Sequence, residues 1–158
     1  MKLLEGKNAI ITGASRGIGK GIAQVFAEQG ANVAFTYSSS VEAATELESE
    51  LISKGVKAKG YKSNAANFDE SQLLAQMVVK EFGSIDILIN NASAINLTRT
   101  DQTPAKRFDL MFDVNVRGTF LTSQAALPHL RKSAAEGRNP HILNLSPPLS
   151  MKPVWFKN

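Results

Sequence analysis

Three glycines in one short loop are the residues of this sequence whose spacing most directly indicates chemistry. Gly13, Gly17 and Gly19 follow an apolar run, Ala9 to Ile11, and precede a segment with helical periodicity. Glycine permits a tight turn and a close approach of the backbone to a ligand, and the free N–H groups at the start of the following helix attract an anion. The order of strand, glycine loop and helix therefore predicts a site for the pyrophosphate of a dinucleotide.

The same loop also permits a second interpretation. Gly13-Ala14-Ser15-Arg16-Gly17 fits the Gly-x-Ser-x-Gly turn that presents a nucleophilic serine in hydrolases. Such a site needs an earlier segment for its oxyanion hole and a histidine base, but only a short stretch precedes the loop and neither histidine has a recognisable triad context. We therefore expect Ser15, Arg16 and Ile18 to bind a cofactor, with acyl transfer as the weaker alternative.

The composition limits the other classes of function. The 158 residues are 43% hydrophobic and 20% charged, which is typical of one globular domain. The net charge of +4 comes from scattered lysines and arginines, so we expect no nucleic-acid partner. There is no cysteine, and two isolated histidines predict no metal site. Without an apolar run of membrane-spanning length, we expect no membrane partner and a cytoplasmic location.

The sequence alternates between strand-like and helix-like segments, which is typical of an α/β protein. Short apolar runs predict five strands, at residues 9–12, 33–37, 57–63, 85–89 and 141–145. In the first helical segment the apolar residues expected to face the sheet are Ile18, Ile22, Val25 and Phe26. We expect the last helix to run unbroken from Thr103-Pro104, as N-cap and first helical position, to about Lys132.

Right-handed crossovers between five such strands give a Rossmann-like, doubly wound parallel sheet of order 3-2-1-4-5 with helices on both faces. We therefore expect one three-layer α/β/α domain over residues 1–158. In such sheets ligands bind outside the carboxyl ends of the strands, where the strand order reverses. The glycine loop follows the first strand and Asn90-Asn91-Ala92-Ser93 follows the fourth, so both motifs should meet at that crevice.

Three motifs together resemble those of the short-chain dehydrogenase/reductase family. Thr12 to Gly19 has the spacing Gly-x-x-x-Gly-x-Gly of the family's cofactor loop. Asn90-Asn91-Ala92-Ser93 is similar to its Asn-Asn-Ala-Gly motif, with Ser93 in place of glycine, and Asn115 matches the helix asparagine of its Asn-Ser-Tyr-Lys tetrad. The resemblance implies a nicotinamide dinucleotide cofactor and the interconversion of a carbonyl with an alcohol.

The resemblance also implies how the cofactor is held. Asn91 and Ala92 would close over a ribose, and Asn64 with Ala65 would hold the adenine. In the family, an acidic residue after the second strand usually binds the unmodified ribose of NAD.

That acidic position offers Thr36, Tyr37, Ser38 and Ser39 in this sequence, without a carboxylate. Arg16 stands in the glycine loop, where its guanidinium could bind a 2′-phosphate. The sequence therefore predicts NADP as the cofactor.

The family's catalytic residues are only partly present. The resemblance assigns catalytic roles to Asn115 and Ser146, with Ser150 as an alternative because the register after the fifth strand is open. The family's general acid is a tyrosine followed by a lysine four residues later, and neither Tyr37 nor Tyr61 has that lysine. We therefore expect a C-terminally truncated chain that is inactive alone, with a non-catalytic NADP-binding or interaction module as the alternative function.

The resemblance further implies a small carbonyl or acyl-thioester substrate, such as a 3-oxoacyl thioester, and a homo-oligomer for a complete relative. Residues 1–85 resemble bacterial 3-oxoacyl-[acyl-carrier-protein] reductases, and the later part resembles a hydroxysteroid dehydrogenase-like branch, which a recombined or a divergent chain would both explain. We expect the fifth strand to expose Ile142, Leu143 and Leu145 on an unpaired edge, so that this chain self-associates or aggregates.

Overall fold

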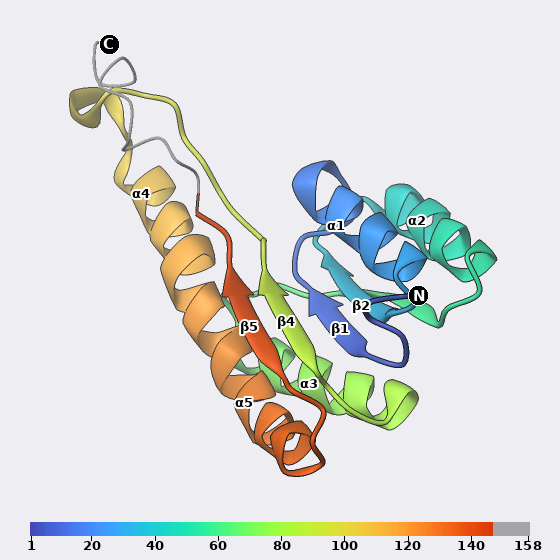
Figure 1. The fold of residues 1–158 in the computed structure, drawn as a ribbon. Helices are drawn as coiled ribbons and strands as arrows, with labels where there is room; N and C mark the ends of the chain where they lie inside the picture. The colour runs from blue at the N-terminus through green and yellow to red at the C-terminus, as the bar shows by residue number, and fades with distance from the viewer. Residues whose placement is uncertain (147–158) are drawn as a thin grey trace.

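The computed structural model describes residues 1–146 as a five-stranded sheet between layers of helices (Figure 1). The strands are β1 (Asn8–Ile11), β2 (Asn32–Tyr37), β3 (Ala58–Lys62), β4 (Ile87–Asn90) and β5 (His141–Asn144). The α-helices are α1 (Gly17–Glu28), α2 (Val41–Ser53), α3 (Phe68–Phe82), α4 (Ala105–Phe112) and α5 (Thr119–Ala135). A 3-10 turn, η1 (Thr100–Gln102), precedes α4, and a π-helical segment, η2 (Asp113–Gly118), joins α4 to α5.

The sheet has the order β3-β2-β1-β4-β5, and every neighbouring pair of strands is parallel. This confirms the predicted Rossmann-like α/β fold with strand order 3-2-1-4-5. Ile11, the last residue of β1, is paired with Phe35 of β2 on one side and with Ile89 of β4 on the other. The order therefore reverses at β1, and the glycine loop leaves the sheet at this point.

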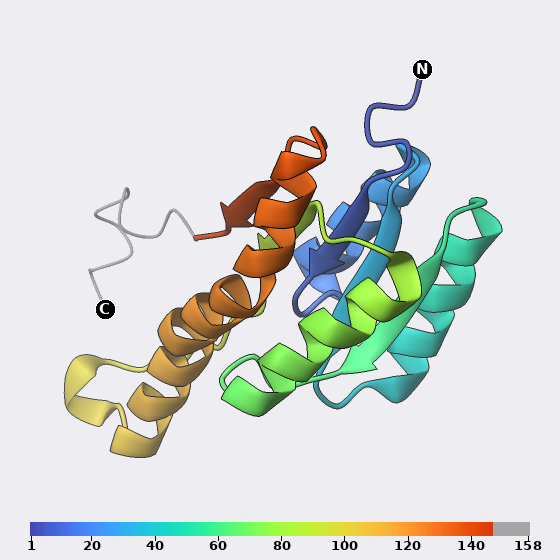
Figure 2. The same cartoon turned by 90° about the horizontal axis from the view of Figure 1, so that it is seen from below.

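Apolar side chains form a separate core on each face of the sheet, which explains why the central strands are apolar on both faces. The core that joins the sheet to α1 and α2 includes Ile11, Phe35, Ala23 and Leu47. The core that joins the sheet to α3 and α5 includes Ile10, Leu88, Leu74 and Leu130. Figure 2 shows the resulting layers, with the strands between α1 on one side and α3 and α5 on the other.

The buried face of α1 differs from the predicted one. Its buried residues are Gly19, Ala23 and Ala27, whereas Ile18 is 71% exposed and Val25 is 53% exposed. Small side chains let the helix axis lie close to the strands, so the small residues face the sheet and the larger apolar residues lie beside or away from it. Of the predicted residues, Ile22 and Phe26 are partly buried against this core, and only Ile18 and Val25 were placed wrongly.

The predicted long helix is present, because residues 105–135 form one continuous run of helical backbone. It is not uniform, since the π-helical segment η2 joins α4 to α5. Pro104 is the N-cap of α4, with φ −63° and ψ 142°, so the helix begins one residue later than predicted. A π-helical turn inserts one extra residue into the helix, and such turns are frequent at functional sites.

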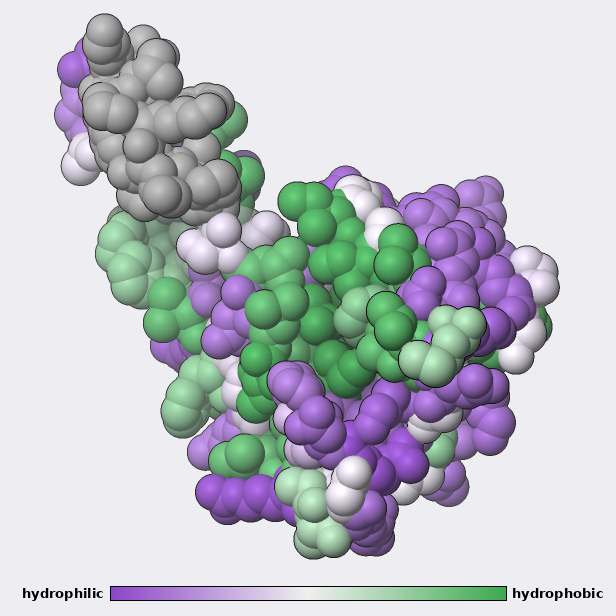
Figure 3. Space-filling model, in the orientation of Figure 1, coloured by the Kyte–Doolittle hydropathy of each residue, from purple (hydrophilic) through white to green (hydrophobic). Residues whose placement is uncertain are grey.

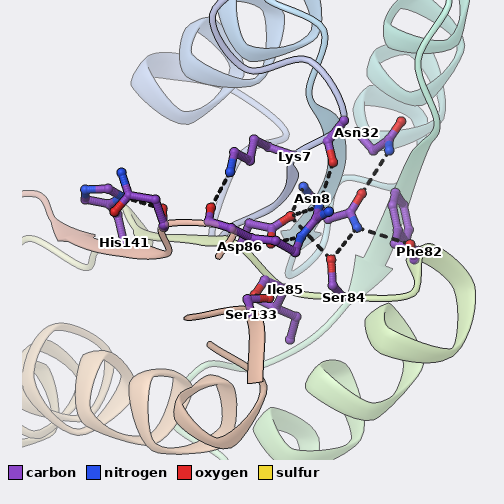
Figure 4. Close-up of polar contacts among 12 residues, drawn as sticks. Lys7, Asn8, Asn32, Phe82, Ser84, Ile85, Asp86, Ser133 and His141 are labelled. Carbon is purple, nitrogen blue, oxygen red and sulfur yellow. Dashed lines mark hydrogen bonds and ion pairs between the residues drawn. The ribbon is translucent and has the colours of Figure 1, made fainter. Parts of the chain in front are cut away.

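A buried ion pair fastens the amino end of β5 to the sheet (Figure 4). Asp86 is fully buried, and its carboxylate accepts hydrogen bonds from Arg138 Nε at 2.7 Å and Nη2 at 2.6 Å. The Asn8 N–H donates to the same carboxylate at 2.8 Å, and Arg138 also donates to the Gly6 carbonyl at 2.7 Å. These contacts join the amino-terminal ends of β1, β4 and β5, at the end of the sheet opposite the glycine loop.

The two outer strands of the sheet differ in how well they are protected from pairing with another chain. At β3, the Gly60 N–H donates to Glu48 Oε2 at 2.7 Å, and a charged group at that position discourages pairing with another strand. Within residues 1–146, β5 pairs only with β4, so its outer side is open, and Ile142 and Leu143 are 40% and 54% exposed. Figure 3 shows hydrophobic residues gathered between α1 and the strands β4 and β5.

Candidate functional site

A cleft of about 750 Å³ opens at the carboxyl ends of the strands. Every predicted cofactor residue except Gly19 lines it, namely Gly13, Ser15, Arg16, Gly17, Ile18, Tyr37, Ser38, Asn64, Ala65, Asn91 and Ala92. Thr36 and Ser93, which belong to segments that the sequence placed at the crevice, also line it, and the lining residues that sequence reasoning missed are Ser63, Ala94, Ile95, Leu110 and Val114. Ser63 follows β3 directly, so the rule that ligands bind beyond the carboxyl ends of strands could have found it.

The glycines of the loop meet distinct steric demands. Gly13 and Gly17 have φ of +66° and +60°, the left-handed region that favours glycine. A Cβ on Gly13 would lie 2.8 Å from Ala92 Cα, and one on Gly19 would lie 2.4 Å from Asn91 Nδ2. Gly19 therefore does not line the cleft, but it permits the close packing of α1 against the β4 loop.

The start of α1 is suited to an anion. Arg16 is its N-cap residue, with an extended backbone, and its side chain is exposed. The first turn contains no acidic residue and no side chain caps it, so the first N–H groups and the positive end of the helix dipole remain for a ligand. Among residues 1–146, no ion pair occupies the Arg16 guanidinium.

The ends of β2 and β3 form the other side of the cleft. Tyr37, Ser38 and Ser63 supply hydroxyl groups, and no Asp or Glu is among the described residues that line the cleft. Asn64 shapes the turn that follows β3, because its side-chain oxygen accepts a hydrogen bond from Ala66 N at 3.1 Å. Its backbone N–H donates to Glu70 Oε2 at 2.7 Å.

Asn91 connects the glycine loop to the end of β4. Its Nδ2 donates to the Thr12 carbonyl at 2.9 Å and to the Gly13 carbonyl at 3.0 Å. In return, Thr12 Oγ1 accepts the N–H groups of Asn91 and Ala92, each at 3.0 Å. These four contacts fix the two segments that sequence reasoning placed at the crevice.

Asn115 lies in the π-helical segment and binds the backbone of the β4 loop. Its Nδ2 donates to the Ala94 carbonyl at 2.8 Å, and its Oδ1 accepts the Ala94 N–H at 2.9 Å. Asn115 itself does not line the cleft, whereas Ala94 and Val114 do. Its side chain therefore holds a wall of the cleft in place.

Ser146 follows β5 beside the end of β4. The preceding Leu145 N–H donates to the Asn90 carbonyl at 3.0 Å, and Asn90 Nδ2 donates to Asn144 Oδ1 at 2.8 Å. Ser146 is exposed at the same edge of the sheet as the cleft but is not among its lining residues. The alternative, Ser150, lies outside the described residues.

Comparison with known proteins places the chain in a family. A family model described as short chain dehydrogenase matches residues 7–156. The chain belongs to the short-chain dehydrogenase family. Hydroxysteroid dehydrogenase-like protein 2 of Danio rerio is 48% identical over 162 residues, which cover 98% of this chain and 38% of that protein. The chain thus spans well under half the length of this short-chain dehydrogenase relative.

Solved structures of the short-chain dehydrogenase family share this fold. A short chain dehydrogenase from Burkholderia cenocepacia, in complex with NADP, is 32% identical with a TM-score of 0.87, and the match covers 97% of this chain and 62% of that one. A blue fluorescent protein from a metagenomic library, in complex with NADPH, is 30% identical with a TM-score of 0.85, and the match covers 94% and 59% of the two chains.

The two tyrosines of the sequence are placed differently. Tyr37 lines the cleft at the end of β2. Tyr61 is buried, and its hydroxyl donates to Glu81 Oε2 at 2.8 Å. Burial, and then the hydrogen bond to Glu81, raise the pKa of Tyr61 well above its usual value. A tyrosine that serves as general acid near neutral pH needs a lowered pKa, so Tyr61 does not fit the role of the short-chain dehydrogenase tyrosine.

The two histidines do not form a triad with Ser15. His141 begins β5, and Ser15 follows the carboxyl end of β1, so the two residues lie at opposite edges of a parallel sheet. His129 lies with Gly83 and Ser84, near the amino end of β4. The hydrolase alternative therefore has no base near its serine.

Two other kinds of site are absent from residues 1–146. Within that range no helix is both long and apolar enough to cross a membrane. The same residues contain no group of three or more His, Cys, Asp or Glu side chains that could hold a metal ion.

Proposed function

We propose that the cleft binds NADP(H) and that this chain is the cofactor-binding part of an oxidoreductase that interconverts a carbonyl and an alcohol. The observation that supports this most is the pairing of Arg16 with the carboxylate-free ends of β2 and β3. A guanidinium binds a 2′-phosphate with charge-assisted hydrogen bonds, whereas a carboxylate there would repel it.

The residues of the cleft fit such a cofactor from end to end. Gly13 and Gly17 let the backbone come close, and the uncapped start of α1 suits a pyrophosphate. Tyr37, Ser38 and Ser63 offer hydroxyl groups to the adenosine end. On the other side of the loop, Asn91 and Ala92 line the cleft beside the end of β4, where they would close over a ribose of the cofactor.

The chemistry would then divide between the cofactor and the chain. When bound, NADPH supplies the hydride that reduces a carbonyl carbon. Asn115 keeps the Ala94 wall of the cleft fixed. We propose that the Ser146 hydroxyl, which follows β5, would donate a hydrogen bond to the substrate's carbonyl oxygen and polarise it. We propose a 3-oxoacyl thioester as the substrate class to test first, in the complete parent protein.

A specific observation favours a second function for these 158 residues by themselves, a non-catalytic NADP-binding module. In short-chain dehydrogenases the tyrosine that acts as general acid is followed by a lysine four residues later, and neither tyrosine of this sequence is. The Tyr61 hydroxyl is also hydrogen-bonded to Glu81. General acid catalysis contributes about 10²- to 10⁴-fold to rate. Binding of NADPH without its oxidation by a 3-oxoacyl thioester would support the module, and steady turnover that Asn115→Ala abolishes would support the enzyme.

Calorimetric titration of the chain with NADPH and NADH tests the cofactor proposal. We expect tighter binding of NADPH, and Arg16→Ala should weaken it by about 10- to 100-fold because a charge-assisted contact is lost. Binding of NADH should not change. Arg131→Ala, an exposed arginine of α5, is the matched control and should leave both affinities unchanged. Equal affinities for the two cofactors in the unmodified chain would contradict the proposal.

A further inference from the structure

Thr36 is a buried polar residue at the end of an otherwise apolar strand. It is 4% exposed, while Val33, Ala34 and Phe35, which precede it in β2, are fully buried. A hydroxyl in such a position loses its hydration and needs a hydrogen-bond partner within the protein. The partner that it has is in the glycine loop.

Both polar groups of Thr36 bind this loop. Its Oγ1 accepts the Gly13 N–H at 3.0 Å, and its carbonyl accepts the Ala14 N–H at 2.9 Å. The regular pairing of β1 with β2 ends one residue earlier, at Ile11 and Phe35. These two bonds therefore extend the attachment beyond the ladder and tie the loop to β2.

On its other side the loop is packed against the end of β4. The space beside Gly13 is closed by Ala92, whose Cα would lie 2.8 Å from a Cβ at that glycine. The Gly13 carbonyl also accepts a hydrogen bond from Asn91. The loop is thus held between β4 and Thr36, and without the threonine hydroxyl the β2 side would keep only the bond from the Ala14 N–H to the Thr36 carbonyl.

The two segments that Thr36 joins carry the two groups at the phosphate end of the cleft. Arg16 is three residues beyond Gly13, and Ser38 is two residues beyond Thr36. Both residues line the cleft. The distance between them depends on how firmly the loop is attached to β2.

We infer that Thr36 is a positioning residue, which sets the placement of Arg16 relative to Ser38 and thereby the preference for NADP over NAD. This inference rests on the proposed function, since it concerns the same cofactor. Thr36 acts through the loop, and the contact with the 2′-phosphate is made by Arg16 and Ser38.

The test compares Thr36→Val, Thr36→Ser and Thr45→Val in titrations with NADPH and NADH. Valine keeps the shape but leaves the partly buried Gly13 N–H without its acceptor, so NADPH affinity should fall by about tenfold. NADH affinity should fall less, so the ratio of the two affinities decreases. Serine restores the acceptor and should keep the ratio. Thr45, whose hydroxyl donates to the Val41 carbonyl on the exposed face of α2, is the control and should change neither affinity.

A merely structural role would lower the melting temperature or weaken both cofactors equally, with the ratio unchanged, and that result would overturn the inference. If Thr36→Val does not melt cooperatively, hydrogen exchange of the unmodified chain decides. The Gly13 amide should then exchange more slowly than the Gly17 amide, and equal rates would overturn the inference. Failure of the unmodified chain to bind either cofactor would instead refute the proposed function.

Discussion

Replacing Arg138 with methionine should destabilise the fold strongly, because it removes the partner of a fully buried carboxylate. Asp86 has no exposed surface, while the Arg138 side chain is 32% exposed. Methionine keeps most of the length and apolar stem of the arginine side chain. The change therefore removes the charge, the two hydrogen bonds to Asp86 at 2.6 and 2.7 Å and the bond to the Gly6 carbonyl, while retaining much of the packing.

The size of the effect follows from what remains around Asp86. Breaking a buried ion pair by removing one partner costs about 3–5 kcal/mol. The Asn8 N–H at 2.8 Å and Ser84 Oγ at 3.3 Å still donate to the carboxylate, and Arg138 is partly solvated, so the lower end applies. With about 3 kcal/mol lost and a urea dependence of about 2 kcal/mol per M, the unfolding midpoint should fall by about 1.5 M urea.

The pH dependence of this effect has a definite sign. Burial raises the pKa of Asp86, but hydrogen bonds from Arg138 and the Asn8 N–H hold it below the ordinary value of 3.8. In the unmodified chain, the stabilisation from Asp86 is therefore present above about pH 4 and is lost as the pH falls below it. In Arg138→Met, burial should dominate and raise the pKa, so acidification favours the variant's fold. The difference in stability should narrow between pH 7 and pH 4.

Urea unfolding followed by circular dichroism at pH 7 and pH 4.5 measures both quantities. Arg131→Met, on the exposed face of α5, is the control and should shift the midpoint little. The double variant Asp86→Leu with Arg138→Met should recover part of the loss, because no uncompensated charge remains. A loss below about 1 kcal/mol at pH 7, or a difference that widens on acidification, would refute the reasoning.

Three further predictions concern other parts of the chain. Gly19→Ala should abolish NADPH binding and lower the free energy of unfolding by about 1–3 kcal/mol, because its Cβ would lie 2.4 Å from Asn91 Nδ2. The control Gly21→Ala, whose Cβ would have nothing within 4 Å, should stabilise α1 by about 0.5–1 kcal/mol in thermal melts. Leu143→Lys should reduce the self-association that we expect from the exposed edge of β5, as light scattering coupled to size exclusion would show; a monomeric unmodified chain would contradict this. Below pH 10, Tyr61→Phe should lower the free energy of unfolding by about 1 kcal/mol, because the hydrogen bond to Glu81 is lost. Since the pKa of Tyr61 is raised in the folded chain, this difference in stability between the two chains should disappear as the pH rises above 10. A difference that stays constant with pH would count against the Glu81 contact.

The sequence predicted the sheet well because β-strand burial and glycine loops leave local signals. The five strands, their order and the convergence of the Gly13 loop with Asn91 follow from short apolar runs and the crossover rule. The π-helical segment around Asn115 left no such signal, because a π-helical turn changes the apolar spacing by only one residue. What distinguishes it is a contact with Ala94, which is 21 positions away in the sequence.

The same limit applies to the polar contacts that hold the site. Thr36 reads as an ordinary β-branched strand residue, and only the fold shows that its hydroxyl meets Gly13. The small-residue face of α1 is a related case, since the periodicity of Ala23 and Ala27 is as regular as that of the larger residues beside them. Contacts between elements that are distant in the sequence decide these roles, and the residues around each position do not show which contacts will form.

The Asp86 ion pair has a consequence for the order in which a ribosome exposes this chain. Arg138 is made 52 residues after Asp86 and 132 residues after Gly6, so the strands β1 to β4 emerge well before the cation that they enclose. At about 5–20 residues per second, the carboxylate waits roughly 3–10 s for its partner. During that interval burial of Asp86 as an ion would lack the Arg138 guanidinium that offsets its cost, so we expect the closed sheet to become stable only once β5 arrives.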